Sequence, residues 1–256
     1  MVLLIDAGNT RVKWAVVDEM AAAGSWHAAG SVPHSEVHEL SKLWRGMSIE
    51  RVLIANVAGP QLRADLEVVL DAVCGDQSGS TPLITWFVST AECAGLRNGY
   101  RQPAQLGHDR FAAAIGARAL YPHRALIVVG CGTATTVDAV SAEGVFTGGM
   151  ILPGLTLMTS ALAGNTAQLP QVSLQAHAAY PFADHTDAAI VSGCLAAQAG
   201  AIERAWAACQ ATQESAVTCI LTGGAADLIA PQLSFAHERV DNLVLIGLQT
   251  IATTSC

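Results

Sequence analysis

The chain has 256 residues, of which 52% are hydrophobic and 13% are charged. This apolar content is enough to build the core of one large domain or two modest ones, and it excludes disorder over most of the chain. The formal net charge of −8 provides no broad basic surface, so we expect no nucleic-acid partner, although a few local donors can still bind a small anion.

The N-terminal sequence does not look like a secretion signal, because its first residues carry no basic segment and Asp6 interrupts the apolar run. The longest apolar stretch, residues 150–164, contains Pro153 and Gly154 and is too short to span a membrane. We therefore expect a cytoplasmic protein without a membrane segment. Seven scattered cysteines form no C-x-x-C pair, which predicts reduced structural thiols.

Predicted strands and helices are mixed in the first half of the chain. Val2–Ile5 and Val12–Val17 are apolar runs on either side of a polar turn, and they predict a β-hairpin. A buried strand is expected at Arg51–Asn56, followed by a helix that begins at Pro60. The apolar face of this helix consists of Leu62, Leu66, Val69, Leu70 and Val73.

A strand is expected at Leu83–Val88 and a helix at Asp109–Leu120. The apolar side of that helix is predicted to be Phe111, Ala114, Ile115 and Ala119.

The pattern of strand, turn and strand recurs after Ala125. Leu126–Val129 and Val137–Val140 are predicted strands, and the segment 130–136 between them is rich in small and hydroxyl residues. When Gly8 is aligned on Gly132 the two hairpins form a weak internal repeat. We therefore predict an α/β protein with two similar lobes, residues 1–115 and 116–256, facing a shared cleft.

The turn of the first hairpin contains the residues that a phosphate site requires. Gly8 lets backbone N–H groups approach phosphate oxygens, Asn9 and Thr10 add donors, and Lys13 adds a positive charge. Asp6 is placed to hold Mg²⁺ directly or through water. Alternatively, the hairpin is an ordinary one in which polar side chains only cap the turn. The second turn of the same kind favours a nucleotide site.

Two other segments allow more than one interpretation. The glycines of Thr222–Ala226, which follow the predicted strand Val217–Leu221, could lie against adenine or ribose, or could only allow close packing of the strand on a helix. His34 and His38 are four residues apart, but the H-E-x-x-H pattern is absent and we expect no metal there. Neither a Walker motif nor a Rossmann motif is present.

Five segments together resemble the type III pantothenate kinase family, also known as the Bvg accessory factor family, over essentially the whole chain. They are D-A-G-N-T at 6–10, Y-R-Q-P-A-Q-L-G-H-D-R at 100–110, G-T-A-T-T-V-D at 132–138, G-G-M-I-L-P-G at 148–154 and T-A-Q-L-P at 166–170. The resemblance implies the fold of the acetate and sugar kinase, Hsc70 and actin superfamily, with ATP between two ribonuclease-H-like lobes. It also implies ATP-dependent phosphorylation of pantothenate to 4′-phosphopantothenate, the first step of coenzyme A synthesis, by a homodimer.

By the same resemblance, Asp109 is the catalytic base, Thr133 contacts ATP, and Thr186 contacts pantothenate across the dimer interface. The first phosphate loop corresponds to Asp6, Ala7, Gly8, Asn9, Thr10, Arg11, Val12 and Lys13. The other pantothenate contacts correspond to Tyr100, Gly107, His108, Asp109 and Arg110.

Each of these roles has a simpler alternative. Arg110 could fork onto the pantothenate carboxylate, or Asp109 and Arg110 could only be first-turn helix residues, with the acid favoured by the helix dipole. Thr186 could be a plain N-cap, and Tyr100 a packed aromatic.

The chain departs from the family pattern at Gly130, where an Asp is usual. That acid would ligate a monovalent cation, so the potassium or ammonium requirement implied by the resemblance is in question. Two alternative functions remain open, namely another small-molecule kinase of the superfamily and a non-catalytic ATP-binding regulator.

Overall fold

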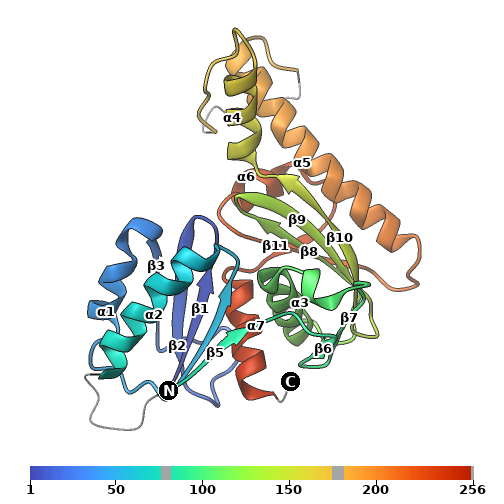
Figure 1. Ribbon diagram of the computed structural model, residues 1–256. Coiled ribbons are helices and arrows are strands. Elements are labelled where there is room, and N and C mark those ends of the chain that lie inside the picture. The colour runs from blue at the N-terminus through green and yellow to red at the C-terminus, as the bar shows by residue number, and fades with distance from the viewer. Residues whose placement is uncertain (76–81, 175–181, 255–256) are drawn as a thin grey trace. The chain divides into compact units, whose positions relative to one another are not determined.

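The computed structural model describes residues 1–75, 82–174 and 182–254 (Figure 1). The chain forms two compact units. Unit 1 comprises Met1–Pro122, Gly144–Phe146 and Asn242–Cys256, and unit 2 comprises His123–Glu143 and Thr147–Asp241. These units differ from the expected division at residue 115, because the helix that ends at Leu120 and the C-terminal helix both pack within unit 1.

Unit 1 is built on a five-stranded sheet with the order β3-β2-β1-β4-β5. Strand β2 is antiparallel to β1 and β3, whereas β1, β4 and β5 are parallel. The strands are β1 (Val2–Ala7), β2 (Arg11–Val17), β3 (Ala28–Pro33), β4 (Arg51–Asn56) and β5 (Leu83–Phe87). The predicted hairpin and the strand at 51–56 are confirmed, and β5 ends one residue before the predicted Val88.

Helices cover both faces of this sheet, with α1 (Leu40–Leu43) and α2 (Pro60–Gly75) on one face and α3 (His108–Leu120) and α7 (Leu243–Thr253) on the other (Figure 1). A 3-10 helix, η1 (His34–Glu39), precedes α1. Side chains alternate along the strands, so that Leu3 and Ile5 join the core under α2. The predicted apolar face of α2 is buried throughout. In α3, however, the predicted apolar position Ala119 is exposed, and the buried residues of this helix end at Ala117.

Two glycines allow α3 and α7 to cross closely. A Cβ at Gly247 would overlap the carbonyl oxygen of Ala112, and a Cβ at Gly116 would lie 2.8 Å from the backbone nitrogen of Gly247. The crossing therefore excludes side chains at both positions.

A short hairpin in unit 1, β6 (Glu92–Cys93) and β7 (Leu96–Asn98), is followed by η2 (Pro103–Gln105). Strand β10 (Val145–Pro153) begins in this unit, where Val145 and Phe146 pair with Arg97 and Asn98 of β7, and its remaining residues belong to unit 2.

The unit 2 sheet has the order β12-β11-β8-β9-β10. The predicted second hairpin is confirmed as β8 (Leu126–Cys131) and β9 (Ala134–Val140), with longer strands and a shorter turn than expected. Helix α5 packs on this sheet, burying Val191, Leu195 and Ile202 against Ile127 and Val129. The other elements are α4 (Leu155–Asn165), α5 (Thr186–Gln210), β11 (Thr218–Thr222), α6 (Ala226–Ile229), η3 (Ala230–Gln232) and β12 (His237–Arg239).

Among the described residues, no helix is long and apolar enough to cross a membrane. Cys131, Cys194, Cys209 and Cys219 are free thiols, as expected. Cys93 is disulfide-bonded, and here the expectation of a reduced thiol is wrong. Sequence spacing does not give the distance between Cα atoms that decides whether two cysteines can bond.

Candidate active site

A carboxylate pair lies beside a lysine in unit 1. Asp6, near the end of β1, is directly opposite Lys13 of β2 in the sheet register. Burial raises the pKa of Asp6 to about 7, with Lys13 lowering it and the negative charge of Asp109 raising it. The fold thus brings together the three charged groups that the sequence analysis assigned to phosphoryl transfer.

The turn between β1 and β2 is anchored from β3. Arg11 donates from Nε to Ser31 Oγ (2.8 Å) and from a terminal guanidinium nitrogen to the Ser31 carbonyl (3.0 Å). His34, which follows β3 directly, donates from Nε2 to the carbonyl oxygen of Gly8 at 2.8 Å. Asn9 and Thr10 are exposed at the tip of the turn.

Not every residue of the predicted phosphate loop offers a side chain to a ligand. Ala7 and Val12 are fully buried in the hydrophobic core, so they can contribute only backbone groups. The two histidines that are four residues apart, His34 and His38, have different partners. His34 hydrogen-bonds the carbonyl oxygen of Gly8, and Nε2 of His38 lies 3.0 Å from Glu39 Oε1. No group of three metal-binding side chains occurs in the described part of the chain.

The first turn of α3 holds Asp109 and Arg110. Asp109 Oδ1 accepts a hydrogen bond from the Arg110 backbone N–H at 2.8 Å. The preceding Gly107 is the N-cap residue, and a Cβ there would lie 2.8 Å from Asp109 Oδ1. Any larger residue at Gly107 would therefore displace the carboxylate. The prediction that Asp109 lies in the first turn of a helix is confirmed.

Arg110 is only 7% exposed and lies near two aromatic rings. Its guanidinium donates to the Tyr100 hydroxyl at 3.1 Å, and its central carbon is 5.8 Å from the centroids of both Tyr100 and Phe146. Tyr100 is in turn fixed by Asn98, whose Oδ1 accepts the Tyr100 backbone N–H at 3.0 Å. The arginine is therefore held in place by the Tyr100 hydroxyl and by two aromatic rings.

His108 is oriented by Ser89. The backbone N–H of Ser89 donates to His108 Nδ1 at 3.1 Å. Because Nδ1 accepts this bond, the ring proton of the neutral imidazole lies on Nε2. The family resemblance points to His108, whereas Ser89 and Asn98 were not predicted. Neither residue lies in one of the five segments that resemble the family. Only their hydrogen bonds with His108 and Tyr100 point to them.

The second turn lies in unit 2, where Gly132 and Thr133 are exposed between β8 and β9. The backbone N–H of Gly154 donates to the Thr133 carbonyl at 3.0 Å. A Cβ on Gly154 would lie 2.5 Å from that oxygen, so only glycine fits against the turn.

The remaining predicted residues of unit 2 are distributed over other elements. Thr186 is exposed as the first residue of α5, and the N-cap is His185, so the N-cap interpretation of Thr186 is wrong. Gly223 has a φ of +98°, and a Cβ there would lie 2.5 Å from the Cys131 carbonyl, which supports close packing as its role. Gly224 faces open space, and its interpretation as part of a nucleoside site stays a prediction.

Comparison with known proteins identifies the family. The sequence profile of type III pantothenate kinase matches residues 2–208. The chain is 60% identical to the type III pantothenate kinase of Herminiimonas arsenicoxydans and 61% identical to that of Janthinobacterium sp. (strain Marseille). Each match covers 98% of this chain and 97% of the relative. The chain belongs to the type III pantothenate kinase family.

Solved structures support the fold class of this family. The fold resembles a protein assigned as a 2-dehydro-3-deoxygalactonokinase from Sinorhizobium meliloti, with a TM-score of 0.59 and 12% identity over 98% of both chains. It also resembles a protein assigned to the Baf family of transcriptional activators from Campylobacter jejuni, with a TM-score of 0.56 and 20% identity over 97% of this chain and 96% of that one. With the two mixed sheets, these likenesses confirm the predicted α/β fold.

Proposed function

We propose that this protein phosphorylates pantothenate to 4′-phosphopantothenate with ATP, the first step of coenzyme A biosynthesis. The observation that carries the proposal is the family membership, at 60% identity over 98% of the chain. The arrangement of Asp109, Arg110 and Tyr100 in unit 1 agrees with it, because it offers a base and a fixed cation to a small hydroxy acid.

Asp109 is the proposed catalytic base. Its Oδ1 accepts the Arg110 N–H, so we assign proton transfer from the substrate hydroxyl to Oδ2. Phosphoryl transfer passes through a loose transition state in which positioning and charge neutralisation dominate, and a carboxylate needs only to align the hydroxyl and accept its proton late.

Arg110 is the proposed partner of the pantothenate carboxylate. Because Tyr100 and the two rings already fix its guanidinium, little side-chain freedom is lost when the substrate binds. His108, with Nε2–H available as a donor, and the backbone of Gly107 complete the proposed pantothenate contacts in this unit.

The proposed nucleotide contacts are the loop from Asp6 to Lys13 and Thr133 of the second turn. Mg²⁺ usually binds through one or two carboxylates together with water and phosphate oxygens. Asp6, with its raised pKa and with Asp109 nearby, fits such a site because a cation would relieve the repulsion between the two acids. The ion would neutralise charge on the phosphates of ATP.

Three further features belong to the proposal. Thr186 contacts pantothenate from the partner of a homodimer, the enzyme works in the cytoplasm, and a monovalent cation acts weakly or not at all because Gly130 lacks a carboxylate. All three come from the resemblance and from the sequence.

The test is incubation with Mg-ATP and pantothenate, with mass detection of 4′-phosphopantothenate. Asp109→Asn, purified in parallel, is the control for contaminating kinases, and its turnover should fall by roughly 10²-fold or more while binding of both substrates persists. Near-normal turnover would remove Asp109 from the role of base. If wild type consumes ATP only with another hydroxy acid or a sugar, a different kinase of the superfamily is indicated, and ATP binding without turnover on any acceptor would indicate a regulator.

A further inference from the structure

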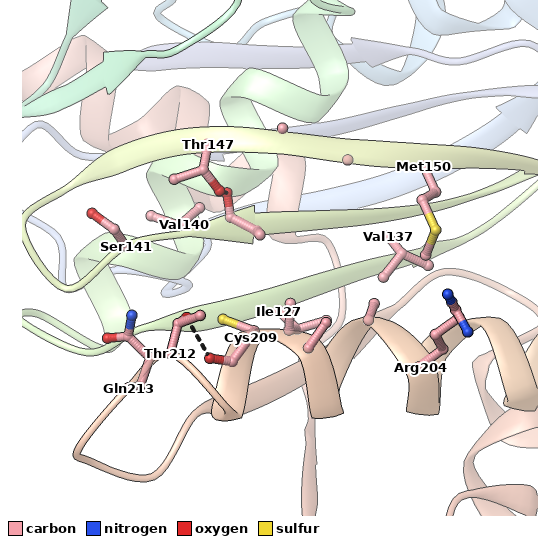
Figure 2. A pocket seen from close by; sticks show the side chains of 15 residues that line it. Ile127, Val137, Val140, Ser141, Thr147, Met150, Arg204, Cys209, Thr212 and Gln213 are labelled. Carbon is pink, nitrogen blue, oxygen red and sulfur yellow. Dashed lines mark hydrogen bonds between the residues drawn. The ribbon is translucent and has the colours of Figure 1, made fainter.

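A pocket of about 450 Å³ lies in unit 2, between one face of the sheet and the C-terminal half of α5 (Figure 2). None of the predicted site residues lines it. Its walls are mostly apolar, and Ile127, Val137 and Val140 contribute from β8 and β9. The volume falls in the usual range for small-molecule sites, about 300–1,000 Å³. A site of this size can hold a ligand that the phosphoryl-transfer chemistry does not require.

Arg204 provides a positive charge at one end of the pocket, and Figure 2 shows its side chain directed from α5 toward the strands. It has no hydrogen bond or ion pair within the described residues. The adjacent acid, Glu203, is occupied by Ser234, whose backbone N–H and hydroxyl both donate to Glu203 Oε1 (2.9 and 2.7 Å). In a chain with a net charge of −8, an unpaired guanidinium beside an apolar wall is well suited to one anionic group.

The opposite end of the pocket is polar but uncharged. Ser141 and Gln213 lie there (Figure 2). Cys209 also lines the pocket, and burial raises the pKa of its thiol, so the thiol remains protonated at neutral pH and acts as an apolar wall. The lining thus runs from a cation, through an apolar middle, to a polar but uncharged end.

We propose that this pocket is a second ligand site, distinct from the kinase site, that binds a small amphipathic anion. The anionic group pairs with Arg204, and an aliphatic body lies against Met150, Ala205 and Cys209, whose side chains are partly exposed in the pocket.

The test measures octanoate binding to the full-length protein by calorimetry, with 1-octanol as an uncharged ligand of the same length. We expect saturable octanoate binding that weakens on the order of tenfold in Arg204→Gln, because a charge-assisted pair is lost. Binding of 1-octanol should not change in that variant. Arg124→Gln is the matched control, since it removes the same charge from an arginine of unit 2 that does not line the pocket.

A second variant, Ala208→Phe, fills the pocket from an exposed helix position and should abolish binding of both ligands. Octanoate binding that is absent in wild type, or equal in wild type and Arg204→Gln, would overturn the proposal. A shift from dimer to monomer in sedimentation for Ala208→Phe would also overturn it, because the pocket would then be part of an interface between copies. Binding is read without turnover, so the outcome is independent of the kinase proposal.

Discussion

The Nε2 of His34 lies 2.8 Å from the carbonyl oxygen of Gly8, although the two residues are 26 positions apart in the chain. A carbonyl can only accept, so the imidazole donates from Nε2 whether it is neutral or charged. The peptide bond is planar and trans, and the bond therefore also turns the N–H of Asn9 away from His34. In this way β3 fixes the orientation of a donor in the proposed phosphate loop.

We expect His34→Ala to raise the KM for ATP by roughly three- to tenfold, because loss of one hydrogen bond frees the peptide to rotate. The KM for pantothenate and kcat should change little. His34→Gln, which can still donate, should recover part of the loss. His38→Ala is the matched control, because His38 is exposed and contacts Glu39 rather than the loop. Equal ATP affinity in His34→Ala and wild type, measured with a non-hydrolysable analogue, would contradict this role.

Asp6 should make stability depend on pH. Its pKa is raised from 3.8 to about 7, mainly by burial, so the folded protein binds this proton more tightly than the unfolded chain does. The resulting stabilisation is complete below pH 3.8 and is lost as the pH rises through about 7. Asp6→Asn removes the titrating group. It should be about as stable as wild type near pH 4 and more stable above pH 7.

Denaturant unfolding of both proteins at several pH values measures the difference in their free energies of unfolding. The contributions of all other titrating groups largely cancel in that difference. A gap between Asp6→Asn and wild type that does not widen with pH would show that Asp6 titrates in its usual range. In Asp109→Asn the Asp6 pKa should fall, because a neighbouring negative charge is gone.

Thr186 tests the proposed dimer. It is exposed at the start of α5, where the N-cap residue is His185. If it contacts pantothenate from a partner subunit, Thr186→Ala should raise the KM for pantothenate several-fold and leave the KM for ATP and the stability nearly unchanged. Mixing Thr186→Ala with Asp109→Asn subunits should restore some intact sites. In a mixed dimer, one site combines the Asp109 of one subunit with the Thr186 of the other. A fully active monomer in sedimentation under assay conditions would contradict the proposal.

The sequence predicted the elements whose signal is local. The hairpin of β1 and β2 has strong apolar runs and helix α2 has strong apolar periodicity, and both form where expected. Strand β3 was missed, because its residues Ala28–Pro33 include Gly30 and Ser31 and its pairing with β2 supplies what its composition lacks. The crossing of α3 and α7 at Gly247 also depends on a partner far along the chain.

The same distinction holds at the candidate site. Asp6 and Lys13 face each other by hairpin register, which the sequence could predict. Asp109 lies near Asp6, and His34 contacts Gly8, but no sequence pattern links the segments that carry these residues. The family resemblance gives Asp6 and Asp109 separate roles in the site, and it gives none to His34.

The last prediction concerns Gly130, which replaces the usual Asp of the family. Gly130 pairs with Thr136 across β8 and β9, and a Cβ added to it would lie 2.8 Å from Thr136 Oγ1. Thr136 must therefore rotate or shift in any variant, at a modest cost in stability. Backbone carbonyls and water could still hold potassium in wild type. Loss of one anionic ligand should nevertheless weaken the site, because ligand charge largely sets affinity for hard cations.

We expect wild type to work without added potassium or ammonium, or to need more of it than Gly130→Asp does. Gly130→Ala is the matched control, since it makes the same contact with Thr136 without adding a carboxylate. Activity is measured against potassium concentration in a buffer free of both cations. Tighter activation in Gly130→Asp than in Gly130→Ala would assign the effect to the charge. Superimposable curves for all three proteins, with strong activation at low potassium, would show that the cation lies elsewhere.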